Sequence, residues 1–573
     1  MFKKLLLMTV VTGVPAAALR GDDLLFDATG DMRIASIMRN PATGVDAYNK
    51  AHLKFANTMN LDKDLNLAEI AHSFGCQTQM GESYLAEMLR TPISPDDQSG
   101  TLQNRTKFIQ KLIEDKKLKA LVEEQVKILH QAEKGVSELF SDNFIGRVCP
   151  ELQELQKLKI TNPWIYQIQS SINESFLLQT GTLALNVTGI ATYTGLMGLM
   201  VWLKVKMPYL LDISTAKFGL MMGYFGLIDG MLIYNLCHNY TTAREKRDLM
   251  HNLNRIVVTA DKLEKIYQDY DLHPQFRVSQ IRDEEGLKLL KMLRHSRYRY
   301  KHLRMFYYPK VHSFMYQLYQ QDQHLAKVFA CVAELDACNA IADTIIASKR
   351  KGANPFCFVK YSKSAAPLIK TKKFWNVLVS NAVTNDFNEQ RQVILTGPNA
   401  GGKTTAIRAI LQNIVLAQTF GIAAASEFEF TQFDVIDSYL NISDDLINGS
   451  SLFVSEVNRA KEVLGRIESL KPNQKYFFAL DELFTGTNDQ DGQECAYQFV
   501  EKIAKYKGVM FIYATHFEKL KTLADELQFC ANYQVGAPEK QKDGKLKYPF
   551  TFIPGASSSR VAQDIAKQAG LFA

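Results

Sequence analysis

The residues best suited to chemistry form a loop between a short apolar run and a helical pattern. Gly397 is followed, after four residues, by Gly402-Lys403-Thr404, which completes the phosphate-binding pattern G-x-x-x-x-G-K-[ST]. Glycines let backbone N–H groups wrap phosphates, and a helix that begins there directs its positive end at the same anion. Lys403 would contact the β- and γ-phosphates, and the Thr404 hydroxyl would bind Mg²⁺. The pattern predicts an ATP site built from Gly397, Pro398, Asn399, Ala400, Gly401, Gly402, Lys403, Thr404 and Thr405.

Two adjacent carboxylates follow a second apolar run. Asp481 and Glu482 end the segment that begins at Tyr476. Taken alone, this pattern is typical of a strand that ends in a solvated acidic turn. With a phosphate loop upstream, Asp481 is instead predicted to hold Mg²⁺, and Glu482 to polarise the attacking water as a catalytic residue. Together the two motifs predict hydrolysis of ATP to ADP and phosphate.

A histidine follows a third apolar run. His516 ends the sequence Phe-Ile-Tyr-Ala-Thr-His that begins at Phe511. At the end of a strand it would sense the γ-phosphate or position the water, so it is the second catalytic candidate. A lone histidine after a strand is more often structural, and its assignment depends on the other motifs.

These motifs need an α/β domain to position them. Val393–Leu395 is predicted to be a buried strand and Thr405–Ala417 a helix, which is the context that a phosphate loop requires. Gly352, Asn354 and Pro355 interrupt the helical pattern before it. We therefore expect an α/β P-loop ATPase domain over residues 355–573, preceded by an all-α domain over residues 60–350.

The helical region contains three stretches with helical spacing. Apolar residues recur at helical intervals over Leu112–Leu129, and a helix is expected from about Ser313 to Ser348. In Ala243–Tyr270 one face is apolar, which predicts either an exposed coiled-coil-like helix or an amphipathic helix packed on its own domain. That face consists of Leu249, Leu253, Ile256, Ala260 and Leu263.

Two long runs within residues 176–236 contain almost no charge. Phe176–Leu203 has no charged residue, and Phe218–Leu236 has only Asp229. Each run is long enough to cross a bilayer as a helix, so a membrane hairpin is predicted in preference to a buried soluble hairpin. Asp229 would then have to face the partner helix or lie near an edge.

The first 25 residues resemble an export signal. Lys3 and Lys4 precede an apolar run, and small residues follow it at Ala16–Ala18. The alternative is an apolar N-terminal helix. The eight cysteines form no C-x-x-C pair, which is typical of reduced core residues. Because ATP is cytosolic, we expect a membrane-associated protein with its ATPase domain in the cytoplasm, and the signal-like segment conflicts with this location.

Four ordered blocks of the C-terminal third resemble the MutS family of DNA mismatch repair ATPases. The phosphate loop is similar to the family's T-G-P-N-M-G-G-K-S, and Ala514-Thr515-His516 matches its A-T-H. Asp481 to Gly492 resembles D-E-x-x-x-G-T-x-x-x-D-G. The block D-D-L-x-x-G-x-S-x-F-x-x-E is resembled by Asp444, Asp445, Leu446, Gly449, Ser451, Phe453 and Glu456. The resemblance implies an ABC-class ATPase that pairs into a homodimer with composite ATP sites, in which Ser451 faces the partner's nucleotide, and that binds DNA.

Upstream the resemblance is weaker and the departures are larger. Residues 64–67 and a few positions after Thr78 resemble the start of the family's helical core and lever. The chain is expected to lack the mismatch-reading N-terminal domain, and the hairpin at 176–236 falls where the family's DNA clamp would branch off. The resemblance implies mismatch repair or recognition of DNA structure; the alternative is a membrane-anchored mechanical or scaffolding ATPase that does not act on DNA. The net charge of +7 permits a polyanionic partner without requiring one, and the basic stretch Arg294–Arg304 is equally a solvated helix face.

Overall fold

The computed structural model describes residues 54–140, 176–206, 214–295, 322–440, 452–541 and 546–558. These residues fall into two compact units. The larger unit holds the described residues of 40–127, 263–277 and 330–573, and the smaller holds those of 128–262 and 278–329. The signal-like segment 1–25 and Ser451 lie outside the described residues, as do residues 313–321 of one expected helix.

A seven-stranded sheet forms the centre of the larger unit. Its strand order is β1-β9-β10-β11-β6-β12-β15, and neighbouring strands are parallel except β12 and β15. Its middle strands are buried over most or all of their length, the usual condition of parallel sheets with helices on both faces. The strands are β1 (Asn57–Met59), β6 (Gln392–Thr396), β9 (Val435–Tyr439), β10 (Tyr476–Asp481), β11 (Val509–Ala514), β12 (Cys530–Val535) and β15 (Phe552–Pro554).

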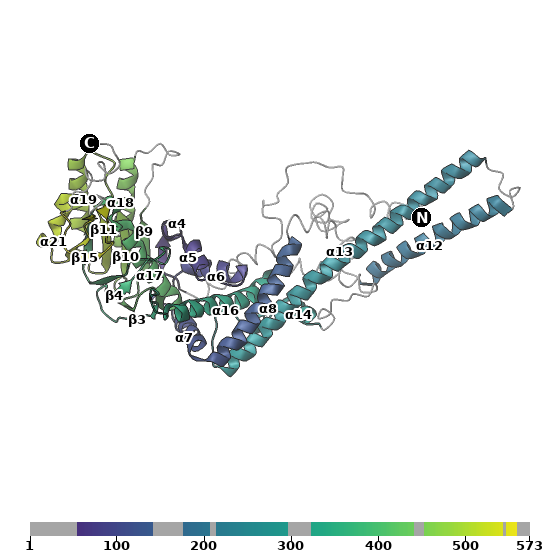
Figure 1. Cartoon of the computed structure of the whole chain (residues 1–573), viewed down its shortest axis with the longest axis horizontal. Coiled ribbons are helices and arrows are strands. Elements are labelled where there is room, and N and C mark those ends of the chain that lie inside the picture. The colour runs from purple at the N-terminus through teal and green to yellow at the C-terminus, as the bar shows by residue number, and fades with distance from the viewer. Residues whose placement is uncertain are drawn as a thin grey trace. The chain divides into compact units, whose positions relative to one another are not determined.

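Helices α17 (Lys403–Phe420), α18 (Leu452–Glu468) and α19 (Asp489–Ile503) flank this sheet (Figure 1). Apolar residues of α18 and α19 share one core with every second residue of β10, beginning at Tyr476. Successive strand residues face opposite sides, so the residues between them lie on the face toward α17, which contacts β10 and β11. The Asn488 side chain caps the start of α19, and Gly421 ends α17 in the left-handed conformation.

The edge strand β1 comes from a distant part of the chain. Residues 57–59 pair in parallel with β9, although more than 370 positions separate the two segments. The adjoining helix α4 strengthens this attachment, because its Asp64 carboxylate is buried and accepts hydrogen bonds from Oγ of Ser438 (2.6 Å) and N of Leu440 (2.9 Å). Nothing in the local pattern of residues 57–59 indicated that they complete the sheet of the C-terminal part.

Smaller sheets and short helices surround the central sheet. A four-stranded sheet has the order β3-β8-β4-β5, and β2 pairs with β7 and β13 with β14. These strands are β2 (Cys357–Phe358), β3 (Lys360–Tyr361), β4 (Ile369–Phe374), β5 (Asn385–Glu389), β7 (Ile422–Ala423), β8 (Glu427–Phe430), β13 (Glu539–Lys540) and β14 (Leu546–Lys547). The short helices are η6 (Asn399–Gly401), α20 (Glu518–Lys521) and α21 (Leu523–Glu526).

The remaining described helices precede the C-terminal part. They are α4 (Leu61–Leu65), α5 (Leu67–Ser73), α6 (Gln79–Arg90), α7 (Thr101–Glu114), α8 (Lys116–Phe140), α12 (Phe176–Lys206), α13 (Thr215–Asp269), η3 (Val278–Gln280), α14 (Glu284–Leu293) and α16 (Asp322–Ser348). The continuous helix expected over Leu112–Leu129 is interrupted at Asp115, whose side chain accepts from the N–H groups of Lys117 and Leu118 and so starts a new helix. The apolar face within Ala243–Tyr270 is fully buried, which favours the packed amphipathic helix over the exposed one.

The predicted membrane-associated location is wrong. Among the helices in the described part of the chain, none combines the length and apolar character that crossing a bilayer requires. The prediction considered the absence of charge, whereas hydropathy also depends on the amide, hydroxyl and glycine residues of 176–206. In the hairpin of α12 and α13, Asp229 is buried and accepts a hydrogen bond from Oγ1 of Thr194 at 2.8 Å. The membrane-associated location is therefore corrected, and the described helices give no support to a membrane partner through 176–236.

Candidate nucleotide site

The three motif strands are neighbours in the central sheet, and their register aligns the motifs. Asp481, the last residue of β10, pairs with Ala514, the last residue of β11. Ala514 in turn pairs with Leu395 of β6, one residue before the end of that strand. The phosphate loop, the two carboxylates and His516 therefore all leave the sheet at its carboxyl edge. In open parallel sheets this edge is where ligands bind.

The phosphate loop depends on the absence of side chains at its glycines. Gly397 and Gly402 have φ values of 140° and 94°, which L-residues rarely adopt. A Cβ at Gly397 would lie 2.4 Å from Cγ2 of Val535, and one at Gly401 would lie 2.6 Å from the same atom. Between these glycines the chain makes the turn η6. The glycines thus let the loop pack closely against Val535 in a conformation that other residues avoid, and a glycine-rich loop of this kind can present its N–H groups to phosphates.

The lysine of the phosphate loop, Lys403, is buried and contacts the first residue of the loop. Lys403 is 3% exposed, its Nζ donates to O of Gly397 at 3.0 Å, and it lies 3.4 Å from Oε1 of Glu482. Lys403 also begins α17, so its positive charge and the positive end of the helix coincide. Of the neighbouring loop residues, Pro398 is buried, whereas Ala400 and Thr405 are exposed.

Two oxygen groups meet where Mg²⁺ is predicted. Thr404 Oγ1 donates to Oδ2 of Asp481 at 2.5 Å. Burial raises the pKa of Asp481 above its ordinary value, and the hydrogen bond from Thr404 opposes that rise. A partly buried carboxylate beside a hydroxyl provides hard oxygen ligands, and Mg²⁺ that is shared with phosphates needs few protein ligands. The donor set therefore fits the predicted ion.

Glu482 begins a loop with an unusual backbone. Its φ is 52°, and that of Phe484 is 69°, so two residues other than glycine adopt the left-handed conformation. The loop is held to β11, because N of Glu482 donates to O of Ala514 (2.9 Å) and the Tyr513 hydroxyl donates to O of Leu483 (2.8 Å). The Glu482 side chain is 33% exposed, so it is accessible to water at the sheet edge.

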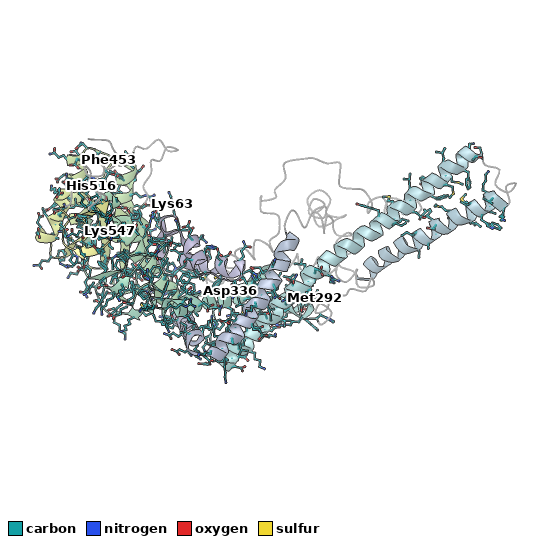
Figure 2. The ribbon with its side chains drawn as sticks, in the orientation of Figure 1. Lys63, Met292, Asp336, Phe453, His516 and Lys547 are labelled. Atoms are coloured by element: carbon teal, nitrogen blue, oxygen red, sulfur yellow. The ribbon has the colours of Figure 1, made fainter. Side chains whose placement is uncertain are left out.

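His516 lies directly after β11 and is exposed (Figure 2). Its ring packs beside that of Phe517, with centroids 4.7 Å apart. The chain is fixed just before it, since N of Thr515 donates to O of Leu395 at 2.9 Å. His516 therefore shares the edge of the sheet with the other motifs, and its catalytic role stays a prediction.

An aromatic residue that the motifs did not indicate lies against the phosphate loop. A Cβ at Gly402 would lie 3.2 Å from Cδ1 of Phe550. Phe550 is 47% exposed and stacks on Tyr548, with ring centroids 6.1 Å apart and planes at 25°. Asn385 holds this segment through two hydrogen bonds, from its Nδ2 to O of Phe550 and from N of Phe552 to its Oδ1. An aromatic surface beside a phosphate loop is suited to contact a nucleotide base.

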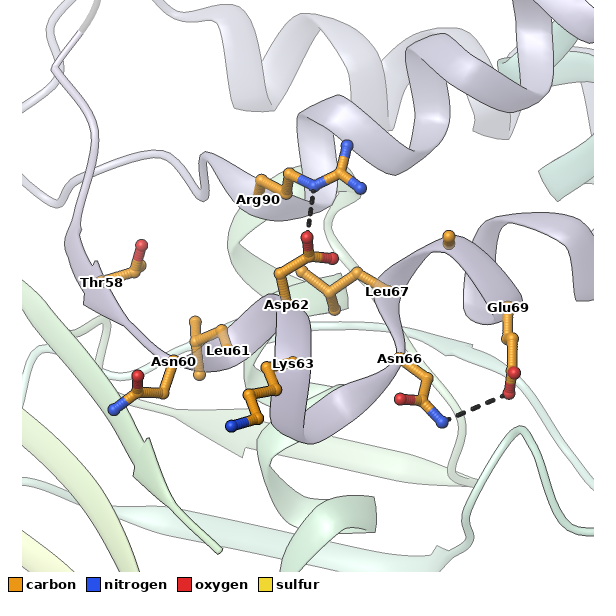
Figure 3. A pocket seen from close by; sticks show the side chains of 10 residues that line it. Thr58, Asn60, Leu61, Asp62, Lys63, Asn66, Leu67, Glu69 and Arg90 are labelled. Atoms are coloured by element: carbon orange, nitrogen blue, oxygen red, sulfur yellow. Dashed lines mark hydrogen bonds and ion pairs between the residues drawn. The ribbon is translucent and has the colours of Figure 1, made fainter. Parts of the chain in front are cut away.

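A separate hollow lies at the start of the described chain and contains none of the predicted site residues (Figure 3). It is lined by β1, α4, α5 and the end of α6. Nε of Arg90 donates to Asp62 at 2.9 Å, and Nδ2 of Asn66 donates to Glu69 at 3.4 Å. These two contacts pair four of the polar side chains that line the hollow with one another.

Comparison with known proteins agrees with the position of these motifs. The family model for MutS domain V matches residues 393–572. The DNA mismatch repair protein MutS of Streptococcus thermophilus (strain ATCC BAA-491 / LMD-9) is 32% identical over 193 residues, which is 34% of this chain and 22% of that protein. The MutS of Exiguobacterium sp. (strain ATCC BAA-1283 / AT1b) is 28% identical over 249 residues, which is 43% of this chain and 28% of that protein. The chain thus matches about a quarter of the length of these relatives, and its C-terminal part is similar to MutS.

Proposed function

We propose that this protein binds and hydrolyses ATP as a MutS-like ATPase. The observation that carries the proposal is the meeting of four side chains from two distant motifs. Lys403 is paired with Glu482, and Thr404 is hydrogen-bonded to Asp481. A buried cation, a pair of oxygen ligands and an accessible carboxylate at one edge of a parallel sheet form the set that phosphoryl transfer to water uses.

Each residue has a distinct part in the proposed reaction. The N–H groups of the loop and Lys403 bind the β- and γ-phosphates and stabilise the charge that develops on them. Thr404 and Asp481 hold Mg²⁺, which supplies positive charge to the phosphates when it is bound. Glu482 accepts a hydrogen bond from the attacking water and orients it toward the γ-phosphorus. His516, at the same edge, is proposed to position that water or to contact the γ-phosphate.

The partners are also proposals. We infer a homodimer with composite sites, in which Ser451 of one chain faces the nucleotide of the other. We further infer that DNA is the substrate of the ATP-driven motion, in mismatch repair or in recognition of DNA structure. The names of the similar proteins and the net charge of +7 support a DNA partner.

The test is ATP turnover by the full chain with and without duplex DNA, at two salt concentrations. We expect Lys403→Ala to abolish turnover and the surface variant Lys505→Ala to preserve it. Stimulation by DNA that weakens with salt would support the DNA-directed function, because phosphate contacts release counterions. Turnover that is indifferent to DNA would instead favour a mechanical or scaffolding ATPase. Turnover that survives Lys403→Ala would overturn the proposed site.

A further inference from the structure

A buried glutamate of a neighbouring helix holds the loop that follows the two carboxylates. Glu456 lies in the second turn of α18 and is 1% exposed. Its Oε1 accepts hydrogen bonds from N (2.9 Å) and Oγ1 (3.2 Å) of Thr485, and its Oε2 accepts one from N of Gly486 (3.0 Å). A single carboxylate thus satisfies three donors of one loop, and hydrogen bonds to a charged acceptor are stronger than neutral ones.

The same loop is pressed against the start of α18. A Cβ at Gly486 would lie 2.7 Å from N of Phe453, 3.0 Å from Cγ of Leu452 and 3.1 Å from Oε2 of Glu456. Only glycine fits at this position. The lack of a side chain at Gly486 allows its N–H group to come close enough to Glu456 for a hydrogen bond. This close approach is a second sign that the loop is packed tightly against α18.

The held loop is the one whose backbone is strained. Left-handed residues such as Glu482 and Phe484 persist only where surrounding contacts leave the chain no alternative. On the β11 side those contacts are the hydrogen bonds from Glu482 to Ala514 and from Tyr513 to Leu483. On the other side they are the hydrogen bonds to Glu456. Loss of the hydrogen bonds to Glu456 would let the loop relax. The Glu482 side chain would then change direction.

We propose that Glu456 is a positioning residue for Glu482. It touches no phosphate or water itself, and acts by keeping residues 482–486 in the conformation that aims the Glu482 carboxylate. This inference rests on the proposed function, because it assigns Glu482 to the attacking water. It also extends that function. Helix α18 begins one residue after Ser451, so Glu456 connects the helix that follows Ser451 in the sequence with the loop that follows Glu482.

The test is steady-state turnover and binding of a fluorescent ATP analogue (mant-ATP) by Glu456→Gln. The amide has the shape of the carboxylate, but one of its two oxygen acceptors is replaced by an NH₂ group. That group cannot accept a hydrogen bond from the loop. We expect kcat to fall about tenfold to a hundredfold, as for a group misplaced by roughly 1 Å, with mant-ATP affinity unchanged. Glu462→Gln is the matched control, since Glu462 lies on the same helix but is 40% exposed and pairs with Arg459 at the surface.

A merely structural role makes different predictions. It would lower the thermal midpoint and the mant-ATP affinity along with kcat, and it would add to the effect of Glu482→Gln. If Glu456 acts through Glu482, the double variant is no slower than Glu482→Gln alone. Additive losses, or an unchanged kcat in Glu456→Gln, would overturn the inference. Should Glu456→Gln not fold, Gly486→Ala displaces the same loop where it packs against α18, and an unchanged kcat in that variant would also overturn the inference.

The two proposals fail in different ways. If wild type and Lys403→Ala show the same turnover, the ATPase assignment itself is wrong. If Lys403→Ala is inactive while Glu456→Gln turns over at the wild-type rate, the site stands and the positioning role of Glu456 is lost.

Discussion

Nζ of Lys403 lies 3.4 Å from Oε1 of Glu482, so the cation of the phosphate loop is paired with the carboxylate that follows β10. The lysine is 3% exposed and the glutamate side chain 33% exposed, so the pair joins a buried charge to one that reaches water. The two residues serve different steps of the proposed reaction, one in binding phosphates and one in orienting water. Their substitutions should therefore separate binding from chemistry.

Lys403→Ala is expected to weaken ATP binding about tenfold to a hundredfold, because a hydrogen bond to a charged group contributes about 1.5–3 kcal/mol. Isothermal titration with a non-hydrolysable ATP analogue measures this directly. Lys505→Ala serves as the control, since Lys505 is exposed and pairs only at the surface with Glu501. Equal affinities in wild type and Lys403→Ala would place the phosphates elsewhere.

Glu482→Gln is expected to retain ATP binding and to lower kcat about a hundredfold to ten-thousandfold, the usual contribution of a general base. The neutral amide forms no ion pair with Lys403, so the lysine is more available to the phosphates. The affinity for ATP should therefore equal or exceed that of wild type. Single-turnover hydrolysis separates chemistry from product release. Loss of affinity in parallel with the rate would argue against a role confined to the water.

Phe550→Ala is expected to weaken ATP binding about fivefold to 150-fold, because stacking of a base on an aromatic ring contributes about 1–3 kcal/mol. Binding of inorganic tripolyphosphate, which has no base, should be unaffected by the substitution. Phe529→Ala is a matched control, because Phe529 is exposed to a similar extent. A parallel loss for both ligands would show that Phe550 supports the loop and not the base.

Asp437→Asn is expected to remove a pH dependence from the stability of the larger unit. Asp437 is fully buried on β9, and burial raises its pKa from 3.8 to about 6, against the hydrogen bond from Tyr476 and the charge of Arg466. Between those values the folded state holds a proton that the unfolded state has lost, so stability falls as pH rises from about 4 to about 6.

The size of that effect follows from the two pKa values. The unfolding free energy of wild type minus that of Asp437→Asn should fall by up to about 3 kcal/mol across this interval, because folded and unfolded pKa values that differ by one correspond to about 1.36 kcal/mol. Urea denaturation at several pH values measures it. Asp525→Asn, at an exposed position, is the control: the unfolding free energy of wild type minus that of this variant should not change with pH. A difference that rises with pH would mean that Asp437 is ionised more easily in the folded protein.

Arg105→Ala is expected to cost about 3–5 kcal/mol of unfolding free energy, because it removes the cation beside the buried Glu334 carboxylate, which also accepts hydrogen bonds from N of Gln275 and N of Phe276. The two side chains are each 1% exposed and 3.7 Å apart, and Arg105 also donates to O of Thr419 near the end of α17. The surface variant Arg90→Ala, which loses the ion pair with Asp62 (Figure 3), should cost at most about 1 kcal/mol. Equal costs for both variants would contradict the buried pair.

The candidate nucleotide site could be predicted from the sequence because each of its motifs is local. A phosphate loop needs its glycines, lysine and hydroxyl at set spacings within one strand–loop–helix unit, and residues 397–404 have them. The carboxylates of Asp481 and Glu482 end a strand, and strands of a parallel sheet bring their carboxyl ends to one edge. Local pattern and the rules of parallel sheets were thus sufficient to group the four central side chains.

Only the tertiary structure decided the contacts between segments that lie far apart in the chain. The pairing of β1 with β9, the approach of Phe550 to Gly402 and the hold of Glu456 on the loop after Glu482 each depend on how distant elements pack. The scarcity of charges in residues 176–236 predicted a membrane-associated location, which the described helices contradict, since none of them is long and apolar enough to cross a bilayer. Periodicity and spacing describe a segment by itself, whereas its neighbours determine which of its groups are buried, paired or available to a ligand.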